Sequence, residues 1–199
     1  MELKEYHRDL LAELANIGAG NAATALSKML QDLTVTLMVP EVKVAPLQDV
    51  PESLGDPEQE IAAVLLEADS DEISLTVVLA LTGQSISLLF DKLLPRGYEP
   101  FGEIGRSLLM ELGNILVSSY LGALSTMTGF VLKVTPPSLG LDMAGALLGS
   151  VIADKMMLED SFILIKTTMR VHNEDIEGNL LLLPETGSLE KIYRQMGVY

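Results

Sequence analysis

The sequence contains no cysteine and no tryptophan, and only 5% of its residues are aromatic. A disulfide framework, a thiol nucleophile and a thiolate metal site are therefore excluded. The shortage of aromatic side chains leaves little to stack against a sugar ring, which argues against a glycosidase built on a carboxylate pair. The two histidines, His7 and His172, have no ligand partners near them in the sequence. We expect both on the surface, and we expect no metal or cofactor site in this chain.

Basic residues are also scarce, with 13 Lys and Arg against 28 Asp and Glu and a formal net charge of -15. A phosphate backbone or an anionic lipid surface would be repelled, so a nucleic acid is a poor candidate partner. The first residues are too charged for a signal peptide, and we find no apolar run of the roughly 18 to 20 residues that cross a bilayer. We therefore expect a cytoplasmic protein without membrane insertion.

An internal repeat is the most informative feature that is present. Residues 103–115 repeat residues 5–17 at an offset of 98, with identical Glu, Arg, Leu, Leu, Glu, Leu, Asn and Ile. The dipeptide at 186–187 likewise repeats the Thr-Gly at 82–83, at an offset of 104. The chain is therefore internally duplicated. We interpret residues 1–199 as a single domain made of half-repeats 1–95 and 101–199.

The hydrophobic pattern predicts a similar order of elements in the two halves. We expect long amphipathic helices at 5–30 and 101–128, and shorter helices at 83–93, at 141–153 and after Gly187. Strands are expected at 34–39, 42–44, 61–68, 73–81, 130–134, 161–171 and 176–183. Each half alone would expose an apolar sheet face. The predicted fold class is therefore α+β, a pseudo-twofold domain whose joined antiparallel sheet carries both long helices over one core.

The repeated helix keeps polar residues that packing alone has no reason to keep twice. Positions i, i+4 and i+7 share one face of a helix. One line therefore carries Asp9, Glu13 and Asn16, and its repeat carries Ser107, Glu111 and Asn114. A single Glu-x-x-Asn is a weak signal, but Asp/Ser-x-x-x-Glu-x-x-Asn occurs here twice, in matching places. We interpret these residues as two functional sites.

This doubled motif resembles that of the chemotaxis phosphatases of the CheC, CheX and FliY family. Residues 16–23, 141–148 and 186–187 extend the similarity over nearly the whole chain. Two motifs in one chain resemble CheC-type members more than CheX, which has one per subunit. The resemblance implies a CheC-like fold and hydrolysis of the aspartyl phosphate on CheY, a response regulator.

The resemblance also implies a role for each motif residue. Asn16 and Asn114 would position the attacking water, because a carboxamide can accept a proton from it. Glu13 and Glu111 would dock the regulator by accepting a charge-assisted bond from its active-site lysine. Mg²⁺ would be held by the regulator and not by this chain.

The alternative is a non-catalytic adaptor that binds the regulator or CheD, the receptor deamidase that CheC-type proteins bind. The roles are not exclusive, and binding of both CheY and CheD is expected. The family resemblance places a possible CheD contact in the apolar segment 141–153, although such a segment is more often core. Its candidate residues are Asp142, Met143, Gly145, Ala146 and Gly149.

Overall fold

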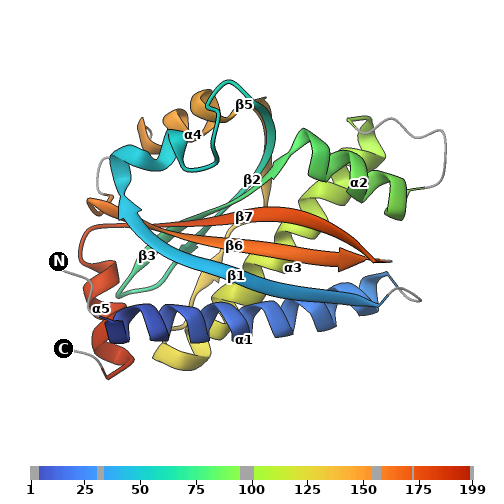
Figure 1. The fold of residues 1–199 in the computed structure, drawn as a ribbon. Helices are drawn as coiled ribbons and strands as arrows, with labels where there is room; N and C mark the ends of the chain where they lie inside the picture. The colour runs from blue at the N-terminus through green and yellow to red at the C-terminus, as the bar shows by residue number, and fades with distance from the viewer. Residues whose placement is uncertain (1–4, 31–33, 95–100, 154–157, 172, 198–199) are drawn as a thin grey trace.

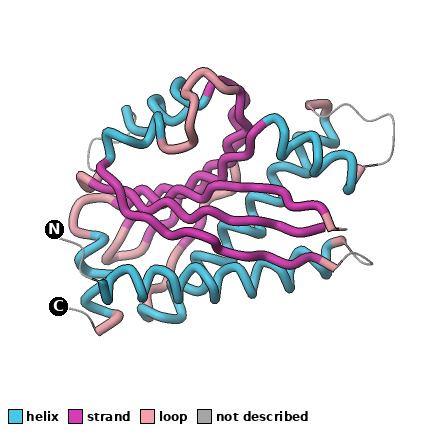
Figure 2. The backbone as a smooth tube through the Cα atoms, viewed as in Figure 1, coloured by secondary structure: helices cyan, strands magenta, loops and turns pink. Residues whose placement is uncertain are grey.

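The computed structural model describes residues 5–30, 34–94, 101–153, 158–171 and 173–197. Within these residues, seven strands form one antiparallel sheet, with the order β1-β6-β7-β3-β2-β4 and with β5 also paired to β2 (Figures 1 and 2). The strands are β1 (Val35–Pro46), β2 (Glu60–Asp69), β3 (Ser74–Thr82), β4 (Lys133–Val134), β5 (Ser138–Met143), β6 (Ser161–Val171) and β7 (Glu174–Pro184). The helices are α1 (Glu5–Met29), η1 (Leu47–Glu52), α2 (Gly83–Leu93), α3 (Glu103–Thr128), α4 (Ala144–Ala153) and α5 (Ser188–Gln195).

The two halves of the chain interlock in this sheet. Each half contributes one hairpin, β2–β3 or β6–β7, and the hairpins join through β3 and β7, where Leu79 lies opposite Leu180. The strand before each hairpin pairs with the hairpin of the other half, β1 with β6 and β5 with β2. A helix follows each hairpin, α2 or α5. The predicted joined, pseudo-twofold antiparallel sheet is confirmed, whereas the proposed boundary between the halves lies mostly outside the described residues.

Side-chain alternation along the strands gives the sheet two apolar faces. On β2, Ala62 and Val64 point to one face and Ile61 and Ala63 to the other, as the two-residue period of a strand requires. The first face packs against α1 and α3, and the second against α4 and η1 (Figure 1). The expectation of one core was therefore wrong, because the residues described form two buried clusters, one on each side of the sheet.

The two long helices lie on the same face of the sheet and run in opposite directions (Figure 1). They approach closely at Gly18, where an added Cβ would lie 2.6 Å from Cδ1 of Tyr120. Gly18 therefore permits a close crossing of the two helices. Gly20 does not lie at this crossing, since an added Cβ there has no neighbour within 4 Å. Helix α3 ends at Gly129, whose positive φ of 77° suits glycine.

Three sequence-based boundaries needed correction. Strand β1 is continuous where two strands were expected, because Pro40 lies on an edge strand and the register shifts between Met38 and Glu41. The strand expected at 130–134 is reduced to Lys133–Val134. The helix expected at 141–153 begins only at Ala144, since the preceding residues pair with β2 as β5.

Helix α3 is long and apolar enough to cross a bilayer, contrary to the expectation from the sequence. Half of its most apolar stretch is buried inside the molecule, including Leu116, Val117 and Leu124. A core helix of a folded domain meets the same criteria of length and composition, and its position against the sheet explains its apolar character.

Candidate active site

The first triad occupies the solvent-facing side of α1. Asp9, Glu13 and Asn16 are exposed, whereas Leu11 and Leu14 between them are almost fully buried. The period of 3.6 residues per turn produces this division, since the leucines fall on the face toward the sheet. Asn16 also has an apolar neighbour, Ile17, whose side chain is 36% exposed.

The second triad has the same arrangement on α3, but its Asn is less exposed to solvent than that of the first triad. Ser107 and Glu111 are exposed, and Asn114 is half-buried. Gly113, just before it, seats the helix tightly on the sheet, since an added Cβ would lie 2.5 Å from Cγ1 of Val64.

The functional groups of the triads are mostly unengaged within the protein. In the described part of the chain, the side chains of Glu13, Glu111 and Asn16 have no hydrogen bond or ion pair. Asn114 has one contact, with Ser118 Oγ donating to its Oδ1 at 3.5 Å. The structure thus assembles each triad on its own helix, and no hydrogen bond within these regions joins the two. Carboxylates and carboxamides left free in this way can bind groups supplied by another molecule.

Sequence reasoning missed several residues on the same helix faces. Ile104 lies three residues before Ser107 and is 48% exposed, and Phe101, which precedes the first residue of α3, is 51% exposed. Ser118 lies four residues after Asn114 on the same side of the helix. The i, i+3 and i+4 spacing could have identified Ile104 and Ser118, but their exposure depends on tertiary packing. Phe101 lies before the helix, where this spacing does not apply.

The prediction that His7 lies on the surface was wrong. Its side chain is 4% exposed, and its ring lies 4.3 Å from that of Tyr6 and 4.4 Å from that of Tyr193, centroid to centroid. His7 thereby packs the start of α1 against α5, a contact that the local sequence does not reveal. His172 lies outside the described residues.

The residues of the possible second contact lie at the end of β5 and on α4, the helix that covers the sheet face opposite α1 and α3. Asp142 and Met143 are exposed at the end of β5, and α4 packs inward through Ala144 and Leu148. Ala146 is exposed, Gly149 is half-buried, and Gly145 lies against the backbone of Pro57. The interpretation of this segment as part of the core is therefore correct only for the side of α4 that carries Ala144 and Leu148.

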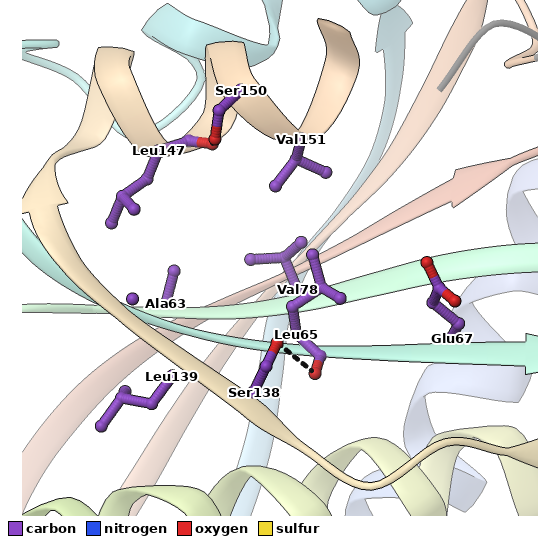
Figure 3. A pocket seen from close by; sticks show the side chains of 10 residues that line it. Ala63, Leu65, Glu67, Val78, Ser138, Leu139, Leu147, Ser150 and Val151 are labelled. Atoms are coloured by element: carbon purple, nitrogen blue, oxygen red, sulfur yellow. Dashed lines mark hydrogen bonds between the residues drawn. The ribbon is translucent and has the colours of Figure 1, made fainter. Parts of the chain in front are cut away.

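Two cavities flank this second region. One of about 360 Å³ lies between α4 and strands β2 and β5, with Leu147 and Val151 of α4 opposite Ala63 and Leu65 (Figure 3). Another of about 670 Å³ extends from Glu60 and Asp142 to Phe101. No triad residue lines either cavity, so the triads form exposed helix surfaces. The described residues contain no cluster of three or more His, Asp or Glu side chains placed to hold a metal ion.

Comparison with known proteins matches both copies of the motif. The model of the CheC-like family matches residues 7–44 and again residues 104–141. The two matched segments each begin in a long helix and contain its Glu and Asn.

Individual relatives extend the similarity over the whole chain. The protein named CheY-P phosphatase CheC of Bacillus subtilis strain 168 is 27% identical over 201 residues, covering 98% of this chain and 96% of the relative. The flagellar motor switch phosphatase FliY of the same organism is 28% identical over 145 residues, which is 70% of this chain and 37% of FliY. The crystal structure of Thermotoga maritima FliY has the same fold, with a TM-score of 0.78 and 20% identity over 99% of this chain and 98% of that one.

Proposed function

From these matches to the CheC-like family we propose that this chain is a member of it and that it hydrolyses the aspartyl phosphate of a CheY-type response regulator. The observation that carries the proposal is the pair of Glu-x-x-Asn sites, both solvent-facing and with their carboxylates unengaged in the described residues. A relative aligned over nearly its full length is named a CheY-P phosphatase, which supports the same activity. The activity would place the protein in the cytoplasm with its substrate.

The proposed chemistry needs positioning more than a nucleophile from this protein. An acyl phosphate is already activated, and its transfer to water is accelerated by orienting the water and stabilising charge. The carboxamide of Asn16 or Asn114 accepts a hydrogen bond from one water and holds it in line with phosphorus. No covalent intermediate on this chain is required.

Docking of the regulator is assigned to the carboxylates. Glu13 and Glu111 each accept a charge-assisted hydrogen bond from the regulator's active-site lysine, which also sets the register of the neighbouring Asn. Ile17 on α1 and Ile104 at the start of α3 add apolar area to the two docking surfaces. Mg²⁺ is assigned to the acidic pocket of the regulator.

A second candidate function is binding of CheD, either beside the phosphatase activity or in its place as an adaptor. The observation that favours it is the position of the exposed residues Asp142, Met143 and Ala146, on or beside the sheet face opposite α1 and α3. A partner bound there leaves the triads accessible. Ala146→Arg should then abolish CheD binding and leave phosphatase activity unchanged, and retained binding would refute this assignment.

The phosphatase proposal is tested by the loss of labelled phosphate from a phosphorylated CheY-type receiver. Asn16→Ala and Asn114→Ala should each remove hydrolysis at one site, with a loss of roughly 2 to 4 kcal/mol of transition-state stabilisation there. Asn21→Ala, an exposed carboxamide elsewhere on α1, is the matched control and should retain full activity. No acceleration by the wild-type protein, despite measurable binding, would favour the adaptor.

A further inference from the structure

The two sites share Glu and Asn but differ one turn beyond the Asn. Residue i+4 from Asn114 is Ser118, and residue i+4 from Asn16 is Gly20. Side chains four residues apart on a helix are neighbours, so only the second site offers a group that can reach the carboxamide.

The Ser118 hydroxyl differs from several other hydroxyls on the long helices, which donate to the backbone carbonyl four residues earlier. Thr24 donates to the carbonyl of Gly20 at 3.0 Å, Ser119 to that of Ile115 at 2.7 Å, and Thr126 to that of Gly122 at 2.9 Å. Ser118 instead has its hydrogen-bond contact with Oδ1 of Asn114, at 3.5 Å. That distance is long for an O–H···O bond, so the contact restricts the orientation of the carboxamide without fixing it firmly.

The carboxamide of Asn16 has no comparable restraint. The side chain of Asn16 is exposed and has no hydrogen bond within the described residues, and Gly20 has no side chain to offer one. The space beside Gly20 is open, since an added Cβ would meet nothing within 4 Å. A serine could therefore be placed there without a clash.

We propose that Ser118 is a positioning residue for Asn114, an inference that rests on the proposed phosphatase activity. The hydroxyl occupies one lone pair of Oδ1 and leaves the other for the attacking water. The carboxamide is then partly oriented before the regulator docks, which lowers the cost of reaching the reactive geometry. Asn16 must be oriented by the docked regulator alone.

The test uses the full chain with a phosphorylated receiver, in two backgrounds that each leave one site. In the Asn16→Ala background, Ser118→Ala should lower kcat about three- to tenfold with KM nearly unchanged. Ser118→Thr in the same background keeps a hydroxyl at this position and should retain the kcat of the Asn16→Ala variant. Thr126→Ala, which removes another exposed hydroxyl of α3, is the control and should leave kcat unchanged. In Asn114→Ala, adding Gly20→Ser should raise kcat.

Each result decides the inference. An unchanged kcat for Ser118→Ala in the Asn16→Ala background overturns it, as does a rise in KM alone, which would identify Ser118 as a docking contact. Failure of Gly20→Ser to raise kcat in a normally folded variant also contradicts it. Full turnover by the Asn16→Ala/Asn114→Ala double variant would overturn the assignment of catalysis to the carboxamides, and this inference with it. The proposed function itself would be overturned only if the wild-type protein failed to accelerate hydrolysis.

Discussion

Within the described part of the chain, Glu13 and Glu111 lack the basic partner that some other surface carboxylates of this protein have. Glu41 lies 2.7 Å from Lys166, and Asp175 accepts two hydrogen bonds from Arg170. These pairings lower the pKa of Glu41 and of Asp175. Glu13 and Glu111 have no such partner among the described residues, which leaves them free for the proposed bond from a lysine of the regulator.

Glu13→Gln and Glu111→Gln keep the shape of each side chain and remove its charge. Because a hydrogen bond to a charged group contributes about 1.5 to 3 kcal/mol, each substitution should weaken receiver binding at its own site about tenfold or more. Isothermal titration with a receiver locked in its phosphorylated form would measure the loss, with Glu177→Gln as an exposed control. Unchanged affinity at both sites would contradict the docking role.

Tyr193 of α5 carries a buried hydroxyl with no hydrogen-bond partner in the described residues. An unsatisfied buried polar group is costly, so Tyr193→Phe should leave the free energy of unfolding unchanged or raise it by up to about 1 kcal/mol at pH 7. Urea unfolding monitored by circular dichroism would measure it. A marked loss of stability would show that the hydroxyl is satisfied in solution.

The same substitution has a pH dependence of known sign. Burial raises the pKa of Tyr193 above its ordinary value of 10.0. The unfolded chain therefore releases this proton at a lower pH than the folded chain, and wild-type stability falls as the pH rises above about 10. Tyr193→Phe should lose less stability between pH 9 and pH 11, roughly the range around that unfolded pKa. Equal losses in the two proteins would contradict the burial of the phenol.

At the scale of elements, the long helices act as rigid supports for the two sites. Glycines let them approach their neighbours, Gly18 at Tyr120 and Gly113 at Val64. The amphipathic period predicted both helices from the sequence, because their buried faces are regular. It failed for β5 and the start of α4, since a short apolar run fits a strand or a helix equally well and only pairing with β2 decides between them.

Gly113→Ala should destabilise the protein even though alanine is the better helix former. The added methyl group would overlap Val64, and overpacking of this kind costs about 1 to 3 kcal/mol, more than the helix propensity gained. Gly20→Ala is the matched control, because it has open space and should stabilise by roughly 0.5 to 1 kcal/mol. Thermal unfolding of the two variants would show shifts of opposite sign, and a stabilised Gly113→Ala would contradict the close packing of α3.

At the scale of the whole molecule, duplication explains why the two sites could be proposed from the sequence before the fold was known. The Glu and Asn residues occur in both copies although packing does not require them, and this pointed to a function. The helical period then placed each pair on one face of its helix. Ser118 and Ile104 were missed because they are not shared between the copies: Gly20 and Tyr6 stand at the matching positions. The burial of His7 was missed for another reason, since its partner Tyr193 lies at the far end of the chain.

The interlocked sheet predicts that neither half folds alone. Residues 1–95 would contain β1 without β6 and β3 without β7, and residues 101–199 would contain β5 without β2. Unpaired strands of this kind promote association. Each fragment should therefore fail to form a stable monomer, and mixing the two should restore one cooperative unfolding transition. Size-exclusion chromatography and circular dichroism would test this, and cooperative unfolding of monomeric 1–95 would refute it.

The most direct test of the central claim is the rate of phosphate release from a phosphorylated receiver with the Asn16→Ala/Asn114→Ala variant, measured beside the affinity of the same variant for the receiver. The proposed mechanism predicts that binding is retained, because Glu13 and Glu111 are intact, and that acceleration of hydrolysis is lost. Full acceleration by the double variant would contradict the assignment of catalysis to the two carboxamides.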